Sequence, residues 1–129
     1  MKIGVIGGRD FNDYNRVKKI LDLYPVTVIV SGGASGADSL GKKYSEEVLG
    51  KEPEIYPALW DDLTAEPCKI KIRKKDGKEY NALAGFNRNT DIVNNCQMLI
   101  AFWDGKSPGT KDSLDKAEKI KRTTLIVYF

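Results

Sequence analysis

The chain has 129 residues, of which 41% are hydrophobic and 30% charged, and its formal net charge at pH 7 is +3. These values are typical of a globular protein with a buried core and exclude a disordered or fibrous chain. The sequence has no histidine and two cysteines without CxxC spacing, so we expect no metal site and no disulfide framework. No apolar run approaches the ~20 residues of a membrane span, and the first apolar run is too short for a signal peptide. We therefore expect a cytoplasmic protein that contacts no membrane.

Short β-branched runs alternate with helical patterns along the chain. Strands are predicted at residues 2–6, 26–30, 54–56, 97–102 and 123–128. Helices are predicted from Asn12 or Asp13 to Pro25, from Ala37 to Gly50, at 85–95, and from Pro108 through Lys121. The segment Val-Thr-Val-Ile-Val at 26–30 is apolar almost throughout, as expected of a strand that is covered on both faces. This alternation predicts one α/β domain over residues 1–129, with helices on both faces of a mainly parallel sheet of about five strands.

Residues 57–84 interrupt the alternation. Apolar and polar residues alternate from Cys68 to Arg73, as in a strand. Asp76-Gly77 is a turn sequence, and residues 78–80 can form the returning strand. We therefore predict a β-hairpin inserted at 67–82, which projects from the domain because its apolar content is low. Its six basic residues are Lys69, Lys71, Arg73, Lys74, Lys75 and Lys78.

The strongest functional pattern is a set of three glycine-rich segments, at 7–10, 31–36 and 104–110. Each follows a predicted strand, and ligands of open α/β sheets bind beyond the carboxyl ends of the strands, where the strand order reverses. An order of 3-2-1-4-5 would place that point between the strands that end at Ile6 and Phe102. Glycine lets the backbone approach a phosphate closely, and the free N–H groups of the following helix face the anion. The sequence thus predicts an anion pocket, although neither Gly-x-Gly-x-x-Gly nor a P-loop is present.

Side chains near these segments complete the candidate site. Arg9 and Arg88 can supply bidentate charge to a phosphate, and Trp60 can stack on a base. The candidate ligand-binding residues are Gly7, Gly8, Arg9, Ser31, Gly32, Gly33, Gly36, Asp38, Trp60, Arg88, Asp104, Ser107, Gly109 and Thr110. No sequence pattern indicates a resident cofactor.

Five motifs in order resemble the YspA/YpsA-related branch of the SLOG superfamily, a domain of unknown function that is frequent in phages and bacteria. They are GGRDF at 7–11, SGGASGAD at 31–38, PALW at 57–60, NRN at 87–89 and AFWDGKSPGT at 101–110. The superfamily also includes the Lonely Guy phosphoribohydrolases and the Rossmann-like domain of the DNA-processing protein DprA. The resemblance covers nearly the whole chain except about residues 61–84. It implies a Rossmann-like fold, a pocket for nucleotide-derived ligands, and a homodimer.

One departure from the Lonely Guy pattern concerns catalysis. Those enzymes carry a motif similar to Pro-Gly-Gly-x-Gly-Thr-x-x-Glu in the last loop. In this sequence Ser113 occupies the position of the glutamate. Asp112 precedes it by one residue, which on a helix is a rotation of ~100°.

Three functions fit these observations, in decreasing order of preference. The first is binding or sensing of a nucleotide or nucleotide-derived phosphorylated ligand. The second is an enzyme that cleaves an N-glycosidic bond, with Asp38, Arg88 and Asp112 as catalytic candidates. The third is DNA binding like that of the DprA domain, through the lysines of the hairpin. The expected partner is a nucleotide-like small molecule, and nucleic acid is the least favoured one.

Overall fold

The computed structural model describes residues 1–129 and contains a five-stranded parallel sheet of order β3-β2-β1-β6-β7. The strands are β1 (Lys2–Gly7), β2 (Val28–Ser31), β3 (Glu54–Ile55), β6 (Met98–Trp103) and β7 (Thr123–Tyr128). The order is the predicted 3-2-1-4-5, so the reversal of strand order lies between β1 and β6.

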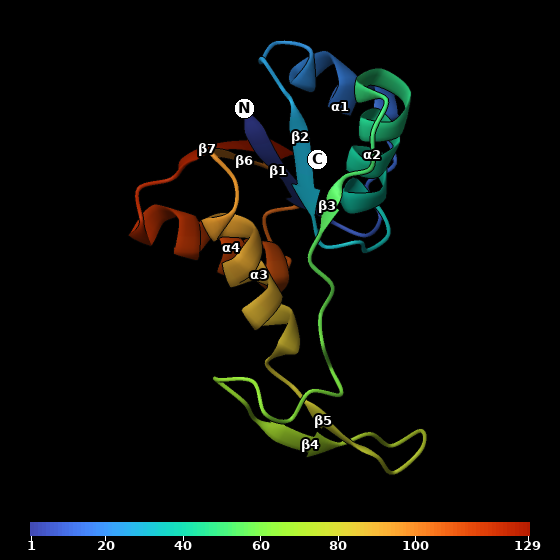
Figure 1. Ribbon diagram of the computed structural model, residues 1–129, viewed down its shortest axis with the longest axis vertical. Helices are drawn as coiled ribbons and strands as arrows, with labels where there is room; N and C mark the ends of the chain where they lie inside the picture. The colour runs from blue at the N-terminus through green and yellow to red at the C-terminus, as the bar shows by residue number, and fades with distance from the viewer.

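Two helices cover each face of the sheet, as Figure 1 shows. They are α1 (Tyr14–Leu21) and α2 (Ala37–Tyr44) on one face, and α3 (Ala84–Asn94) and α4 (Pro108–Lys119) on the other. A π-helical segment, η1 (Ser45–Leu49), continues α2 and ends at Gly50, whose φ is 67°. The predicted three-layer α/β architecture, a Rossmann-like fold, is therefore confirmed. None of the helices combines the length and apolarity needed to cross a bilayer.

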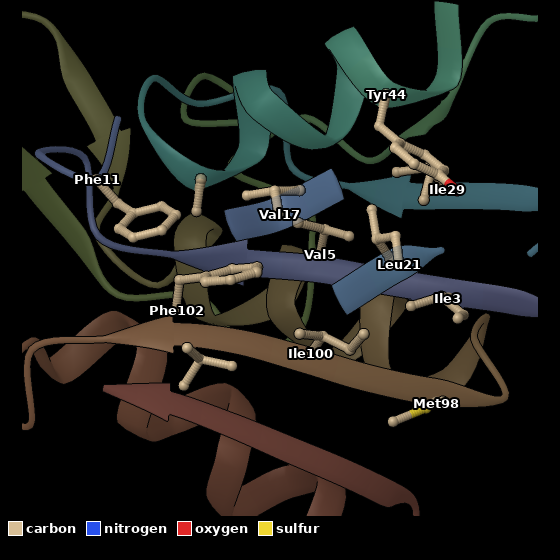
Figure 2. Close-up of a cluster of buried hydrophobic side chains, with 12 residues drawn as sticks. Ile3, Val5, Phe11, Val17, Leu21, Ile29, Tyr44, Met98, Ile100 and Phe102 are labelled. Carbon is tan, nitrogen blue, oxygen red and sulfur yellow. The ribbon is translucent and has the colours of Figure 1, made fainter. Parts of the chain in front are cut away.

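The core beneath α1 and α2 is built from alternate residues of β1, β2 and β6, because successive strand residues point to opposite faces. Val17 and Leu21 of α1 pack there with no exposed surface, and Figure 2 shows them over the strand residues. Phe11, which follows β1, stacks on Phe102 at the end of β6, with ring centroids 4.7 Å apart. The stack fixes the loop after β1 against β6 at the edge where the predicted site lies.

The hairpin is a separate antiparallel pair, β4 (Ile70–Ile72) and β5 (Glu79–Asn81), with Gly77 in its turn at a φ of 69°. It extends away from the sheet, past the beginning of α3 (Figure 1). Asn81 anchors its base. The fully buried side chain accepts hydrogen bonds from the backbone N–H groups of Lys69 and Leu83, at 3.1 and 2.9 Å. The inserted hairpin that the sequence predicts is thus confirmed, with strands shorter than the span 67–82.

The element boundaries differ from the predictions by a few residues. β2 begins at Val28, two residues later than predicted, because Val26 donates its N–H to Tyr24 in a turn. α1 ends at Leu21 rather than near Pro25, and the N–H groups of Leu23 and Tyr24 make tighter bonds three residues back. Asp13 caps α1 by accepting from the N–H of Arg16 at 3.1 Å, as one of the two predicted caps.

We predict that Phe102→Ala lowers the free energy of unfolding by about 3–5 kcal/mol, because it removes a fully buried aromatic ring and leaves a cavity beside Phe11. Urea denaturation followed by circular dichroism measures this change. Leu23→Ala is the control, because Leu23 is 77% exposed and the expected change is within about 0.5 kcal/mol. Equal effects of the two substitutions would contradict the packing described here.

Candidate functional site

A cavity of about 470 Å³ lies at the carboxyl ends of β1 and β6. The loop after β1 and the segment at 107–110 line it, together with one side of α3. This is the point of strand-order reversal at which ligands of such sheets bind. The cavity has the volume of a small-molecule site.

Ten of the fourteen candidate residues line this cavity. They are Gly7, Gly8, Arg9, Asp38, Trp60, Arg88, Asp104, Ser107, Gly109 and Thr110. Side chains outside the candidate set line it as well, among them Phe86, Asn89, Ser113 and Phe129. Asn89 belongs to the NRN motif at 87–89 and Ser113 occupies the position of the missing glutamate, so the sequence contained a pattern for these two. Phe86 and Phe129 carried no such pattern.

The other four candidates are Ser31, which ends β2, and Gly32, Gly33 and Gly36 of the loop that follows; none of them lines the cavity, whereas Ala34 of the same loop does. The carboxylate of Asp38 binds the loop after β2 directly. It accepts a hydrogen bond from the backbone N–H of Ala34 at 3.1 Å. The Ala34 N–H, which a phosphate in the cavity could otherwise use, is therefore taken by a carboxylate of the same chain.

Asp38 is buried, with 7% of its surface exposed. Burial raises the pKa of its carboxyl above the ordinary value of 3.8, against the opposing effects of the Ala34 N–H and of Arg88. Arg88 holds the same loop from its other side, because its Nη1 donates to the carbonyl oxygen of Gly32 at 2.9 Å. The loop after β2 is thus clamped between an acid and a base.

In the segment before α4, some backbone N–H groups are bound by an acid and others have no partner within the helix. Asp104 accepts from the backbone N–H groups of Lys106 and Ser107, both at 2.8 Å, and these bonds hold the pKa of its carboxyl below 3.8. The next residue, Pro108, has no N–H. The N–H groups of Gly109 and Thr110 follow in the first helical turn, where no intrahelical acceptor exists. Because both residues line the cavity, an anion can be received at this end of α4.

Asn89 of α3 holds the start of α4 in place. Its Nδ2 donates to the carbonyl oxygen of Gly109 and to the carboxylate of Asp112, both at 3.2 Å. Asp112 also pairs with Lys116 at 2.8 Å and does not line the cavity. Of the three catalytic candidates, Asp38 and Arg88 therefore lie at the cavity, and Asp112 faces the contact between α3 and α4.

The cavity has a mixed lining. Its charged side chains are those of Arg9, Arg88, Asp10, Asp38 and Asp104. Trp60 and Phe86 contribute half-exposed aromatic rings, and the Trp60 ring lies edge-on to Tyr80 of the hairpin, with centroids 6.4 Å apart. No three side chains of the histidine, cysteine, aspartate and glutamate types come together as a metal site. Such a lining can hold an anion at one end and an aromatic or hydroxylated group at the other.

Comparison with known proteins gives one similarity of fold. No family model matches the sequence, and no curated protein matches it either. Among solved structures, the chain is similar to DNA processing protein A from Helicobacter pylori, in a structure described for its single-stranded DNA binding mode, with a TM-score of 0.65 and 19% identity. The match covers 98% of this chain and 64% of that one, so this chain spans less than two thirds of its structural neighbour. At this identity the match supports the Rossmann-like fold.

We predict that Asp38→Asn removes a pH dependence of stability. The folded pKa of Asp38 lies above 3.8, so the folded state binds the proton more tightly than the unfolded one. Stability of the unchanged protein therefore falls as the pH rises from 3.8 through the folded pKa, and the variant lacks this loss.

Urea denaturation at a series of pH values measures the difference between the two proteins. Asp104→Asn is the matched control. The pKa of Asp104 is lowered, so its contribution to stability is lost as the pH falls below 3.8. A difference between Asp38→Asn and the unchanged protein that does not vary above pH 3.8 would contradict the assignment.

Proposed function

We propose that this protein binds a nucleotide or nucleotide-derived phosphorylated ligand in the cavity at the carboxyl ends of β1 and β6. The observation that carries the proposal is that Gly109 and Thr110, whose N–H groups have no intrahelical acceptor, line a cavity that two arginines also line. A phosphate at this position would receive backbone hydrogen bonds and the positive end of the α4 dipole. Arg9 and Arg88 would add charge-assisted bonds.

The acids of the cavity favour a nucleotide over a simple inorganic anion. Asp10, Asp38 and Asp104 would repel a small anion that filled the whole space. A nucleotide instead carries hydroxyl and amino donors that a carboxylate accepts, as acids do for ribose in dinucleotide-binding folds. Trp60 and Phe86 provide aromatic faces on which a base can stack. The phosphate would thus lie at α4 and the nucleoside toward the aromatic side chains.

We favour binding over cleavage of an N-glycosidic bond. The first turn of α4 has no acidic residue, and the nearest one, Asp112, is paired with Lys116. No carboxylate of α4 thus lines the cavity in place of the catalytic glutamate of the Lonely Guy pattern, and the acids that do line it come from other segments. We also propose membership of the SLOG superfamily, since the glycine-rich motifs and the Rossmann-like fold agree with it. The fold of DNA processing protein A supports this proposal at the level of architecture.

Single-stranded DNA is the second candidate ligand, with the nucleotide in the cavity as one unit of a strand. The structural neighbour is described for its single-stranded DNA binding mode. This similarity favours DNA binding more strongly than the sequence alone does, where it was the least preferred of the three functions. The hairpin favours it independently. Its ion pairs involve Arg73, which contacts Asp61 and Asp76, whereas the lysines at 69, 71, 74, 75 and 78 are exposed and make no ion pair. Unpaired lysines are the groups that bind a phosphate backbone.

We predict that Gly109→Asp lowers the affinity for AMP by about tenfold or more, since two like charges ~4 Å apart repel strongly even at an effective dielectric constant of about 20. Isothermal titration calorimetry measures the affinity. Folding should be preserved, because no atom lies within 4 Å of the Cβ that the substitution adds and an acid in a first helical turn is stabilising.

Gly109→Asn is the matched control, with the same size and no charge, and AMP affinity should remain within about threefold of the unchanged protein. If the two variants lose affinity equally, the phosphate does not lie at α4. If neither the unchanged protein nor the control binds any nucleoside monophosphate, the proposed function is wrong.

The second candidate predicts a salt-dependent affinity for a single-stranded oligonucleotide of about 12 residues, measured by fluorescence anisotropy. Replacement of Lys71, Lys74, Lys75 and Lys78 by glutamine should weaken binding and reduce the slope of log affinity against log salt, by about 0.7 for each phosphate that is no longer neutralised. Replacement of four lysines outside the hairpin, Lys18, Lys19, Lys42 and Lys51, is the charge-matched control. Equal slopes for the two variants would exclude the hairpin as the backbone-binding surface.

A further inference from the structure

A second cavity, of about 280 Å³, lies beside the first one and was not predicted from the sequence. Its walls are the segment 57–67, which leads into the hairpin, and a second side of α3. Its residues 61–67 belong to the part of the chain that the family resemblance does not cover, and the inserted hairpin begins at Pro67. Part of the wall of this cavity therefore comes from a segment outside the family resemblance.

Helix α3 separates the two cavities. Phe86, Asn89 and Ile92, spaced by three residues on one side of the helix, line the first cavity. Asn87 and Asp91, spaced by four, line the second one. Arg88 is the one residue that lines both cavities.

The guanidinium of Arg88 retains free donors at this boundary. Of its five N–H groups, one on Nη1 is used by the carbonyl oxygen of Gly32, and Nε is buried without a partner. The remaining donors on Nη1 and Nη2 are available to a phosphate. An arginine fork is suited to a phosphate that lies between two binding pockets.

The lining of the second cavity suits a base rather than a phosphate. Pro57, Leu59 and Pro67 provide apolar surface, and Glu66 and Asp91 provide exposed carboxylates. Arg88 is its only cationic side chain. Carboxylates repel a phosphate but accept hydrogen bonds from exocyclic amino groups, as acids do from cytosine N4.

We propose that the second cavity binds the second base of a ligand made of two nucleotide units joined through phosphate, and that Arg88 contacts the linking phosphate. This inference rests on the proposed function, because the first nucleotide occupies the cavity at α4. It specifies the ligand class as dinucleotide rather than mononucleotide. It also specifies a preference for an amino-bearing base, such as adenine, over thymine in the second position.

The test compares AMP with the 5′-phosphorylated dinucleotides pApA, pApT and pTpA by isothermal titration calorimetry. Linking two units that each occupy a site should raise the affinity of pApA about 10- to 100-fold over that of AMP. One of the mixed dinucleotides, the one that places thymine in the second cavity, should bind more weakly than pApA. NAD and an adenine strand of about 12 nucleotides then show whether a pyrophosphate-linked dinucleotide or a strand is the better source of the two units.

Two variants and one control test whether the higher affinity of pApA depends on the second cavity. Ala65→Trp should fill it and remove the advantage of pApA over AMP without changing the affinity for AMP, whereas Leu23→Trp in the exposed turn after α1 should change neither. The double variant Glu66→Gln with Asp91→Asn keeps the shape and should reduce the discrimination against thymine.

The outcomes separate the two proposals. If AMP binds and Gly109→Asp weakens it, but pApA binds no tighter than AMP, the second site is excluded and the proposed function stands. The same conclusion follows if Ala65→Trp leaves the pApA advantage intact. If no nucleotide binds, both proposals fail.

Discussion

The close approach of the loop after β1 to the start of α2 is the constraint on which the site depends. Gly36 precedes α2 with a φ of 74°, and a Cβ there would collide with the carbonyl oxygen of Gly8. That carbonyl accepts the first N–H of α2, from Ala37, at 3.2 Å. The contact is possible only because a glycine adopts this conformation and leaves the space empty. It joins the loop after β1 to the start of α2, and residues of both segments line the cavity.

Two acids then determine which backbone donors remain for a ligand. Asp38 accepts from the N–H of Ala34 in the loop after β2, and Asp104 accepts from those of Lys106 and Ser107 in the loop after β6. A glycine-rich loop is therefore not by itself a phosphate site, because an internal carboxylate can take the place of the anion. The N–H groups in the first turn of α4 are not bound by either acid, and Asn89 holds this turn against α3. The proposed phosphate position rests on the donors of this turn and on the lining of the cavity.

The sequence predicts the fold well because strand and helix periodicities are strong and local. The apolar run at 26–30, the cap at Asp13 and the turn at Gly77 all specify structure within a few residues. The position of the cavity also follows, since parallel strands and glycine-rich segments place it by topology. The role of Asp38 does not follow, because a carboxylate in the first turn of a helix has the same sequence pattern whether it meets a ligand or the chain's own loop.

The second cavity, and the position of Phe129 in the lining of the first one, likewise could not be predicted from the sequence. Both arise from segments far apart in the chain that meet in the tertiary structure, such as residues 57–67 against α3. No local periodicity records such a meeting. The pairing of Asp112 with Lys116 is a local i,i+4 contact that could have been foreseen, and it would have lowered the expectation of catalysis.

The contact between Arg88 and Gly32 has an evolutionary consequence. A methyl group at position 32 would collide with Nη1 of Arg88, so the arginine side chain would have to swing away while the backbone stayed in place. Related chains should therefore vary at these two positions together: those that retain the arginine keep a glycine opposite it, and those that lose the arginine are free to carry a larger residue. Such paired variation, sought across homologous sequences, would distinguish chains that share this ligand from those that share only the fold.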